Sequence, residues 1–417
     1  MKPFSPERFL LTLLLALLLI SCGDGASSNS GGIGGSGMTS QGSVSGFGSI
    51  IVNGTEFDTT NSRIIVEGEQ VGSGDANVLT YLDIGKVVTV YGPLPIGDAS
   101  PVADRVTYND NVEGPVESIN VIDPNTRKDL MVLGQTVIVN VVTEFKGTTF
   151  ADLETLALNN NVVEVSGFVD DMGRIWATFL EKTDGLEFEV TGFVENLDTD
   201  QETFEINNIT VDYSGADTSA LPGREPVPDL FVEVEGDSFT PTGKLLADSI
   251  ELGDELEVED ADEIEITGFV TDAGSAPAEF TVGNLVVQTD ANTLFVDLPA
   301  GGILPGQKLE AEGTLESGIL LATEVEFWEP DQIEVEGEVT DATLAPDEFT
   351  LDDTQVVQTD GDTSYEPPGL IITEGINLEV KGVPVGILPS DIIADKVSVV
   401  LREQDPYEII FVDDGST

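Results

Sequence analysis

The sequence predicts an all-β protein, in which a tandem array of five small five-stranded barrel-like modules follows an export signal and a flexible linker. Gly (44 residues) and Pro (21) are abundant whereas Trp (2) and Met (4) are rare, a composition typical of short strands and turns. Val, Ile and Phe alternate with Glu, Asp and Thr, as in half-buried strands. Finally, three short sequence markers recur at intervals of roughly 70 residues.

The composition excludes several classes of function. The 417 residues include 16 Lys and Arg, 78 Asp and Glu, no His and one Cys, which gives a formal net charge of -62. This inventory cannot build Ser-His-Asp or Cys-His catalysis, a His/Cys zinc site, a disulfide, or a haem or iron-sulfur centre. The negative charge also disfavours nucleic-acid binding, because phosphate backbones bind Lys and Arg.

The first element is a signal peptide, predicted over 1–21. Its apolar run from Phe9 to Ile20, about 12 residues, is too short to span a bilayer. Ser21 and Cys22 follow the run, in a pattern that resembles the lipobox of bacterial lipoproteins, where the thiol carries a diacylglycerol. The resemblance implies a lipid anchor at Cys22 and, because Gly23 follows, favours the outer membrane; the alternative is an ordinary secretory signal with an unrelated Cys.

The second element is a tether, predicted over the Gly- and Ser-rich residues 22–41. The modules follow it, and an acidic C-terminal tail ends the chain. Their predicted ranges are 42–111, 112–186, 187–262, 263–332 and 333–402 for modules 1 to 5, and 403–417 for the tail.

Three markers define the modules. The first is a glycine in the opening strand of each module: Gly46, Gly114, Gly192, Gly268 and Gly337. The second is a glycine that ends a later alternating strand: Gly92, Gly167, Gly236, Gly313 and Gly382. The third is an alanine in the closing strand: Ala103, Ala177, Ala247, Ala322 and Ala394. Glycine inside a strand indicates a bulge or a sharp bend, so we expect a structural role for these glycines.

Within each module the pattern predicts five strands, with a looser connection after the third. This is the order of a small OB-like barrel of the oligonucleotide/oligosaccharide-binding type, and a compact sandwich is the alternative. The apolar face of each strand is expected to form the core, and the acidic face is expected to be solvated. Nearest-neighbour packing of the modules is expected to give a semi-rigid array.

Two segments carry a family resemblance. Residues 43–58 (SVSGFGSIIVNGTEFD) and 162–178 (VVEVSGFVDDMGRIWAT) closely resemble the bacterial lipoprotein repeat called domain of unknown function 5666. The resemblance is expected to be strongest over 43–107 and 112–182, while later modules keep mainly the Gly and Ala markers. It implies export and repetition but no known activity, and the only residue role that it carries over is the anchor at Cys22.

Acidic clusters are the most abundant candidate sites. Close-spaced acids on turns supply some of the six to eight oxygens that calcium requires, although no EF-hand loop is complete. The candidate calcium ligands are Asp198, Asp200, Glu202, Asp360 and Asp362. The alternative is a solvated acidic surface; calcium is a possible ligand and no cofactor is required.

Two tryptophans are candidate glycan contacts. Trp176 and Trp328 lie beside the closing strands of modules 2 and 4, where exposed rings would stack on sugars; core or rim packing is the alternative.

The predicted function is that of a non-enzymatic cell-envelope lipoprotein with no catalytic residues, acting as a binding or structural scaffold for which calcium is a candidate stabilising ligand. Its expected partners are the membrane, through Cys22, and an unidentified envelope protein or surface glycan. A carbohydrate-binding surface protein is one alternative. A carboxylate-dependent glycoside hydrolase is the other, because that chemistry needs only two carboxyl groups.

Overall fold

The structure is a computed structural model, and it describes the chain from residue 37 to residue 400 with short gaps. The described residues are 37–47, 49–95, 100–159, 161–185, 188–253, 256, 262–342, 347–352, 355–386 and 391–400. The predicted signal peptide, Cys22 and the predicted C-terminal tail lie outside them. No helix in the described part of the chain is both long and apolar enough to cross a bilayer.

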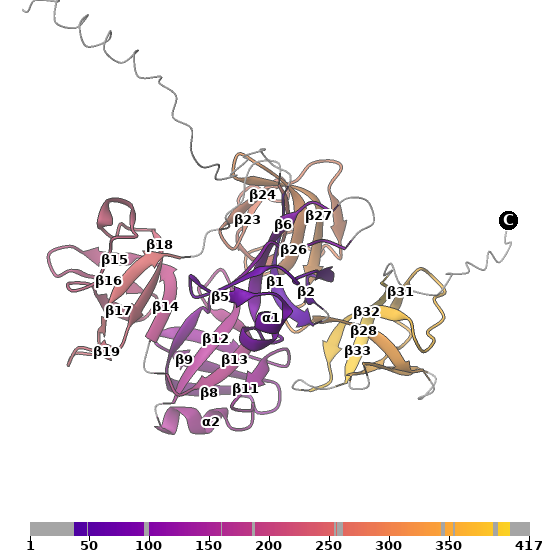
Figure 1. Cartoon of the computed structure of the whole chain (residues 1–417), viewed down its shortest axis with the longest axis horizontal. Helices are drawn as coiled ribbons and strands as arrows, with labels where there is room; N and C mark the ends of the chain where they lie inside the picture. The colour runs from indigo at the N-terminus through magenta and orange to yellow at the C-terminus, as the bar shows by residue number, and fades with distance from the viewer. Residues whose placement is uncertain are drawn as a thin grey trace, which may run out of the picture. The chain divides into compact units, whose positions relative to one another are not determined.

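The clearest barrel, here called barrel 2, pairs its strands in the order β8–β9–β10–β13–β12 and back to β8. Strands β10 and β13 are parallel and the other pairs are antiparallel. Helix α2 follows the third strand and lies at one end of the barrel (Figure 1). The elements of barrel 2 are β8 (Val112–Asp123), β9 (Arg127–Val132), β10 (Gln135–Val139), β11 (Glu144–Lys146), α2 (Leu153–Leu156), η2 (Ala157–Asn159), β12 (Val162–Val169) and β13 (Ile175–Thr183).

The same order of pairing occurs in the two segments here called barrels 4 and 5. Barrel 4 contains β22 (Glu263–Asp272), β23 (Glu279–Val282), β24 (Leu285–Gln288), β25 (Leu294–Val296), β26 (Lys308–Glu316) and β27 (Ile319–Trp328). Barrel 5 contains β28 (Ile333–Asp341), β29 (Glu348–Leu351), β30 (Gln355–Gln358), β31 (Ser364–Glu366), β32 (Asn377–Pro384) and β33 (Ile392–Val399).

Barrel 3 follows the order with its first, fourth and fifth strands each broken in two. It contains β14 (Phe188–Phe193), β15 (Glu195–Asp198), β16 (Thr203–Ile206), β17 (Ile209–Asp212), η3 (Pro222–Arg224), β18 (Phe231–Gly236), β19 (Ser238–Phe239), β20 (Leu245–Leu246) and β21 (Ser249–Leu252).

Barrel 1 closes through a single parallel bridge between Asp58 and Val102, beside the parallel pair β4 and β7. It contains β1 (Gly37–Gly46), β2 (Ile50–Val52), β3 (Thr55–Phe57), β4 (Arg63–Val66), β5 (Glu69–Ser73), α1 (Asp75–Tyr81), β6 (Val87–Pro93) and β7 (Arg105–Tyr108). The all-β prediction of small five-stranded barrels is therefore confirmed. Strand β1 begins at Gly37, so five residues that the sequence places in the tether belong to a strand.

The second and third markers meet at one structural position. Gly167, Gly313 and Gly382 pair with the marker alanines of the neighbouring strand, and the register shifts at each pair. A Cβ at any of these glycines would overlap the carbonyl oxygen that precedes the alanine. Glycine is required here because the bulge brings two backbones together, as predicted.

A recurring hydrogen bond from a hydroxyl group also holds the closing strand at the marker alanine. Thr143, Thr293 and Thr363 each follow the third strand, and their Oγ1 atoms donate to the carbonyl oxygens of the marker alanines at 2.7, 2.8 and 2.7 Å. Ser62 donates to Ala103 in the same way. This recurring bond was not predicted, although a Thr or Ser follows the third strand in barrels 1, 2, 4 and 5.

Pairing between barrels is not restricted to chain neighbours. Strands β8 and β14 join barrels 2 and 3 through Val112 and Val190. Strand β1 runs parallel to β22, with Met38 opposite Glu263, and so joins barrel 1 to barrel 4. The expectation of nearest-neighbour packing is therefore wrong, because the outer edge of β1 is paired with a strand that is distant in the sequence.

Candidate functional site

Glutamates recur three residues before the marker glycines. In opening strands they are Glu189, Glu265 and Glu334, and in fourth strands they are Glu164, Glu233, Glu310 and Glu379. None of these residues is exposed. The prediction that the acidic face is solvated is therefore wrong at these positions, because that face of the first and fourth strands packs against further barrels. The repeated Glu-apolar-x-Gly spacing was the signal in the sequence from which these glutamates could have been identified.

The first junction is the group of charged residues around barrels 1, 2 and 3: Glu67, Lys86, Asp110, Glu113, Glu164, Glu189 and Glu233. Lys86 is 5% exposed, and its Nζ donates to Glu164 Oε1 at 2.8 Å. The Tyr108 hydroxyl donates to the same oxygen, and Lys86 Nζ lies 4.1 Å from the centre of the Tyr108 ring. Lys86 and Glu164 thus join barrel 1 to barrel 2 through an ion pair whose side chains are 6% and 17% exposed.

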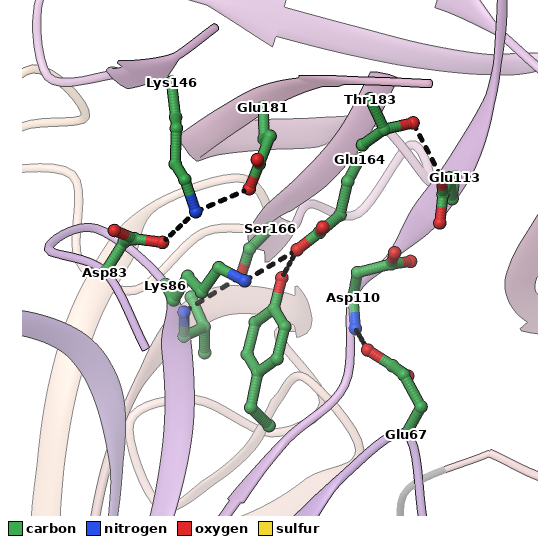
Figure 2. Close-up of polar contacts among 12 residues, drawn as sticks. Glu67, Asp83, Lys86, Asp110, Glu113, Lys146, Glu164, Ser166, Glu181 and Thr183 are labelled. Carbon is green, nitrogen blue, oxygen red and sulfur yellow. Dashed lines mark hydrogen bonds and ion pairs between the residues drawn. The ribbon is translucent and has the colours of Figure 1, made fainter. Parts of the chain in front are cut away.

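Carboxylates gather beside this pair. One oxygen from each of Glu67, Glu189 and Glu233 lies within 4.8 Å of the other two. The Asp110 amide donates to Glu67 Oε1 at 3.2 Å, as Figure 2 shows. Glu67 Oε2, Asp110 Oδ1 and Glu189 Oε1 have no hydrogen-bond partner, although Asp110 is only 5% and Glu189 only 9% exposed.

The electrostatics of the first junction oppose ionisation of these acids. Burial, followed by repulsion from Glu233, raises the pKa of Glu67 to about 8. Burial and the charge of Glu67 raise the pKa of Glu189 to about 11. The pKa of Asp110 is raised well above its usual value by burial and by four acidic neighbours. A buried carboxylate without a positive partner costs several kcal/mol, so these groups either hold protons or share a cation.

The second junction is the group of charged residues around barrels 1, 4 and 5, and it contains three lysines as well as five acids. Its members are Glu265, Glu310, Glu326, Glu334, Glu379, Lys308, Lys381 and Lys396. Lys381 Nζ lies 2.8 Å from Glu326 Oε1. Burial raises the pKa of Glu265 to about 8, although Ser40 Oγ donates to its Oε2 at 2.9 Å. Burial lowers the pKa of Lys308 to about 8.

The second junction makes protein stability depend on pH. Glu265 keeps its proton up to about pH 8 in the folded protein, but an unperturbed Glu releases it near 4.5. Between these values the folded state binds more protons than the unfolded state, so the free energy of unfolding falls as pH rises, by at most about 1.4 kcal/mol per pH unit for this group. Lys308 is protonated in both states below pH 8 and does not oppose this trend.

We therefore expect Glu265→Gln to flatten the fall in stability between pH 5 and pH 8, measured by urea unfolding in the presence of chelator. The groups that act on Glu265 besides Ser40 are Glu312, Glu334 and Glu379. Glu316→Gln, on the exposed side of β26, is the matched control and should keep the wild-type slope. Identical slopes for Glu265→Gln and the wild type would contradict the assignment.

The predicted calcium ligands lie in exposed turns. Asp198 Oδ1 accepts hydrogen bonds from the amides of Asp200 and Gln201 at 3.0 Å, in the turn between β15 and β16, and Glu202 lies in the same turn. Asp360 Oδ1 accepts from the Asp362 amide at 2.8 Å. In the described part of the chain, neither set belongs to a group of three acids close enough to share an ion. The group of three acids that is close enough belongs to the first junction and contains none of the predicted calcium ligands.

The two tryptophans are half-buried. Trp176 Nε1 donates to Asp170 Oδ2 at 2.9 Å, and its ring centre lies 5.5 Å from that of Phe269. Lys381 Nζ lies 3.4 Å from the centre of the Trp328 ring. Protein side chains therefore occupy part of each ring surface, and glycan stacking stays a prediction.

The comparison with known families supports the repeat. A family model described as a domain of unknown function, DUF5666, matches residues 113–181, 191–251 and 267–326. These ranges fall on barrels 2, 3 and 4. The expected resemblance over 112–182 is confirmed, and the matches extend the resemblance to the third and fourth barrels, where we expected mainly the Gly and Ala markers to remain. No curated protein matches the chain. The chain contains tandem repeats of DUF5666.

Proposed function

We propose that this protein is a non-enzymatic, lipid-anchored scaffold of the bacterial cell envelope, built from coupled acidic barrels. The observation that supports this function is the position of the charged residues that the fold brings together. Lys86 with Glu164, and Lys381 with Glu326, each join side chains of two different barrels. These charges hold barrels to one another, which is the use expected in a structural array.

The repetition of the acids also supports a structural role. Raised pKa values often mark catalytic groups, but buried ion networks produce them as well. Glu189, Glu265 and Glu334 have raised pKa values and occupy one position of the repeat, three residues before the opening glycine. A catalytic pair of carboxyls is needed once per active site, whereas a packing position recurs with the barrel. We therefore propose no catalytic residue in these barrels.

The proposed lipid anchor and the surface charge indicate where the protein is located and which partners it attracts. Lipid on Cys22 would hold the chain at the membrane, with the outer membrane favoured by Gly23, and several acyl chains make such anchoring stable. The net charge of -62 would repel polyanions and attract cationic or calcium-bridged partners, which we propose to be an envelope protein or a surface glycan.

The anchoring is tested with Cys22→Ser in the full chain, expressed in a Gram-negative host. We expect the wild type to incorporate labelled palmitate and to fractionate with the membranes, and we expect the variant to do neither. Ser27→Ala, in the same segment, is the control and should behave as the wild type. Unlabelled wild-type protein in the soluble fraction, or membrane retention of the variant, would overturn the lipid anchor.

A further inference from the structure

We propose that the first junction is a calcium site, in which Glu67, Glu189 and Glu233 hold one ion between barrels 1 and 3. The inference goes beyond the proposed function, because it depends neither on the lipid anchor nor on a partner. It also differs from the sequence-based calcium prediction, which concerned acids in exposed turns.

The spacing of the carboxylate oxygens fits calcium. Calcium binds oxygens at about 2.3–2.6 Å in flexible geometry, so two ligands of one calcium ion lie at most roughly 5 Å apart. Magnesium demands a near-ideal octahedron and keeps several of its waters, which a site made of three carboxylates from separate segments favours less. The oxygens of Glu67, Glu189 and Glu233 lie within 4.8 Å of one another. Water is expected to supply the further ligands, because calcium takes six to eight oxygens.

Three different parts of the chain supply these ligands. Glu67 occupies the turn between β4 and β5, where its φ of 46° is in the left-handed region. Glu189 lies on β14 and Glu233 on β18, and these strands are antiparallel partners in which Glu233 pairs with Thr191, two residues from Glu189. An ion held here would tie a turn of barrel 1 to the first and fourth strands of barrel 3.

Unpartnered buried oxygens point to a missing positive ligand. Asp110 is 5% exposed and Glu189 is 9% exposed, yet Asp110 Oδ1 and Glu189 Oε1 accept no hydrogen bond. The Asp110 amide occupies one oxygen of Glu67 and leaves the other without a donor. A buried acceptor left without a partner costs about 1–3 kcal/mol, and more if it is charged. A cation held by Glu67, Glu189 and Glu233 would place a positive charge among these buried acids.

The second junction shows how this fold otherwise balances its buried acids. There, Lys308 and Lys381 lie among the glutamates, and Lys381 binds Glu326 directly. In the first junction, Lys86 is engaged with Glu164, and the strongest charged neighbours of Asp110 are all acidic. As defined above, the first junction contains one lysine and six acids, whereas the second contains three lysines and five acids. A divalent ion would add positive charge where the acids outnumber the lysines most.

The test is calorimetric titration of calcium into the purified full chain after chelation, with melting curves at matched sodium ionic strength. We expect one saturable site per chain, a melting temperature that rises with calcium, and at least tenfold weaker binding of magnesium. Glu67→Gln and Glu189→Gln, which lie on different barrels, should each weaken calcium binding at least tenfold. Asp198→Asn and Glu265→Gln are matched controls and should bind as the wild type does.

Each outcome decides the proposal. Melting of the Gln variants in chelator at or above the wild-type temperature would show that their lost affinity is not unfolding, since Gln is a neutral side chain with the shape of Glu. No saturable site in the wild type would overturn the proposal, and would mean that the buried acids of the first junction are neutralised by protonation. Loss of binding in Asp198→Asn alone would overturn it in favour of the turn acids. None of these results depends on the lipid anchor.

Discussion

Gly167→Ala is expected to lower the free energy of unfolding by roughly 3–5 kcal/mol, the range of severe backbone and packing defects. Gly167 lies on β12 at the bulge opposite Ala177. A Cβ there would overlap the carbonyl oxygen of Trp176 and crowd the Ala177 Cα. Both obstacles are backbone atoms held in the sheet, so relief requires separating two paired strands. Urea unfolding followed by circular dichroism measures the loss.

Gly215→Ala is the matched control. No atom lies within 4 Å of a Cβ built on Gly215. A glycine whose conformation alanine also adopts gains about 0.4–1 kcal/mol on replacement, because the unfolded chain loses freedom. We therefore expect this variant to be as stable as the wild type or slightly more stable. A similarly small effect at Gly167 would show that β12 and β13 separate easily, and would contradict a structural need for the repeated glycine.

This bulge also explains why the barrels were predictable from the sequence. The fourth-strand glycine and the fifth-strand alanine recur because they face each other where two backbones approach closely, as Gly313 and Ala322 do in barrel 4. A local requirement of this kind leaves a local signature. The helix α1 left none: over its seven residues, from Asp75 to Tyr81, only Val78 is buried, which is too little apolar periodicity to predict a helix.

The candidate site was not predictable in the same way. Asp198 and Asp360 were chosen because acids close in sequence share a turn, and the structure uses each of them to accept backbone amides. The acids that lie close together come from distant parts of the sequence: Glu67 belongs to barrel 1, and Glu189 and Glu233 belong to barrel 3. Alternation correctly placed Glu189 and Glu233 on the outer face of their strands. It could not show that another barrel covers that face, because this depends on tertiary contacts.

Lys86→Met is expected to cost roughly 3–5 kcal/mol, because it leaves Glu164 buried without its positive partner. Methionine retains most of the aliphatic stem but lacks the ammonium group, whose Nζ lies 4.1 Å from the ring centre of Tyr108 and 5.1 Å from that of Phe179, so the lost stability reports the charge. Lys146 supplies the matched control. It lies 3.0 Å from Asp83 and 3.1 Å from Glu181, but its side chain is 49% exposed, and Lys146→Met should cost less than about 1 kcal/mol.

The double variant Lys86→Met/Glu164→Gln separates the two sources of this loss. If the cost arises from an unpaired buried carboxylate, neutralising Glu164 should recover most of it, because removing both charges of a buried pair is often neutral. Urea unfolding of the four chains gives the coupling energy directly. Equal losses for Lys86→Met and Lys146→Met, or no recovery in the double variant, would contradict the assignment. Recovery would mean that Lys86 is needed because Glu164 is buried, and that the contact between barrels 1 and 2, rather than either barrel alone, fixes the identity of both residues.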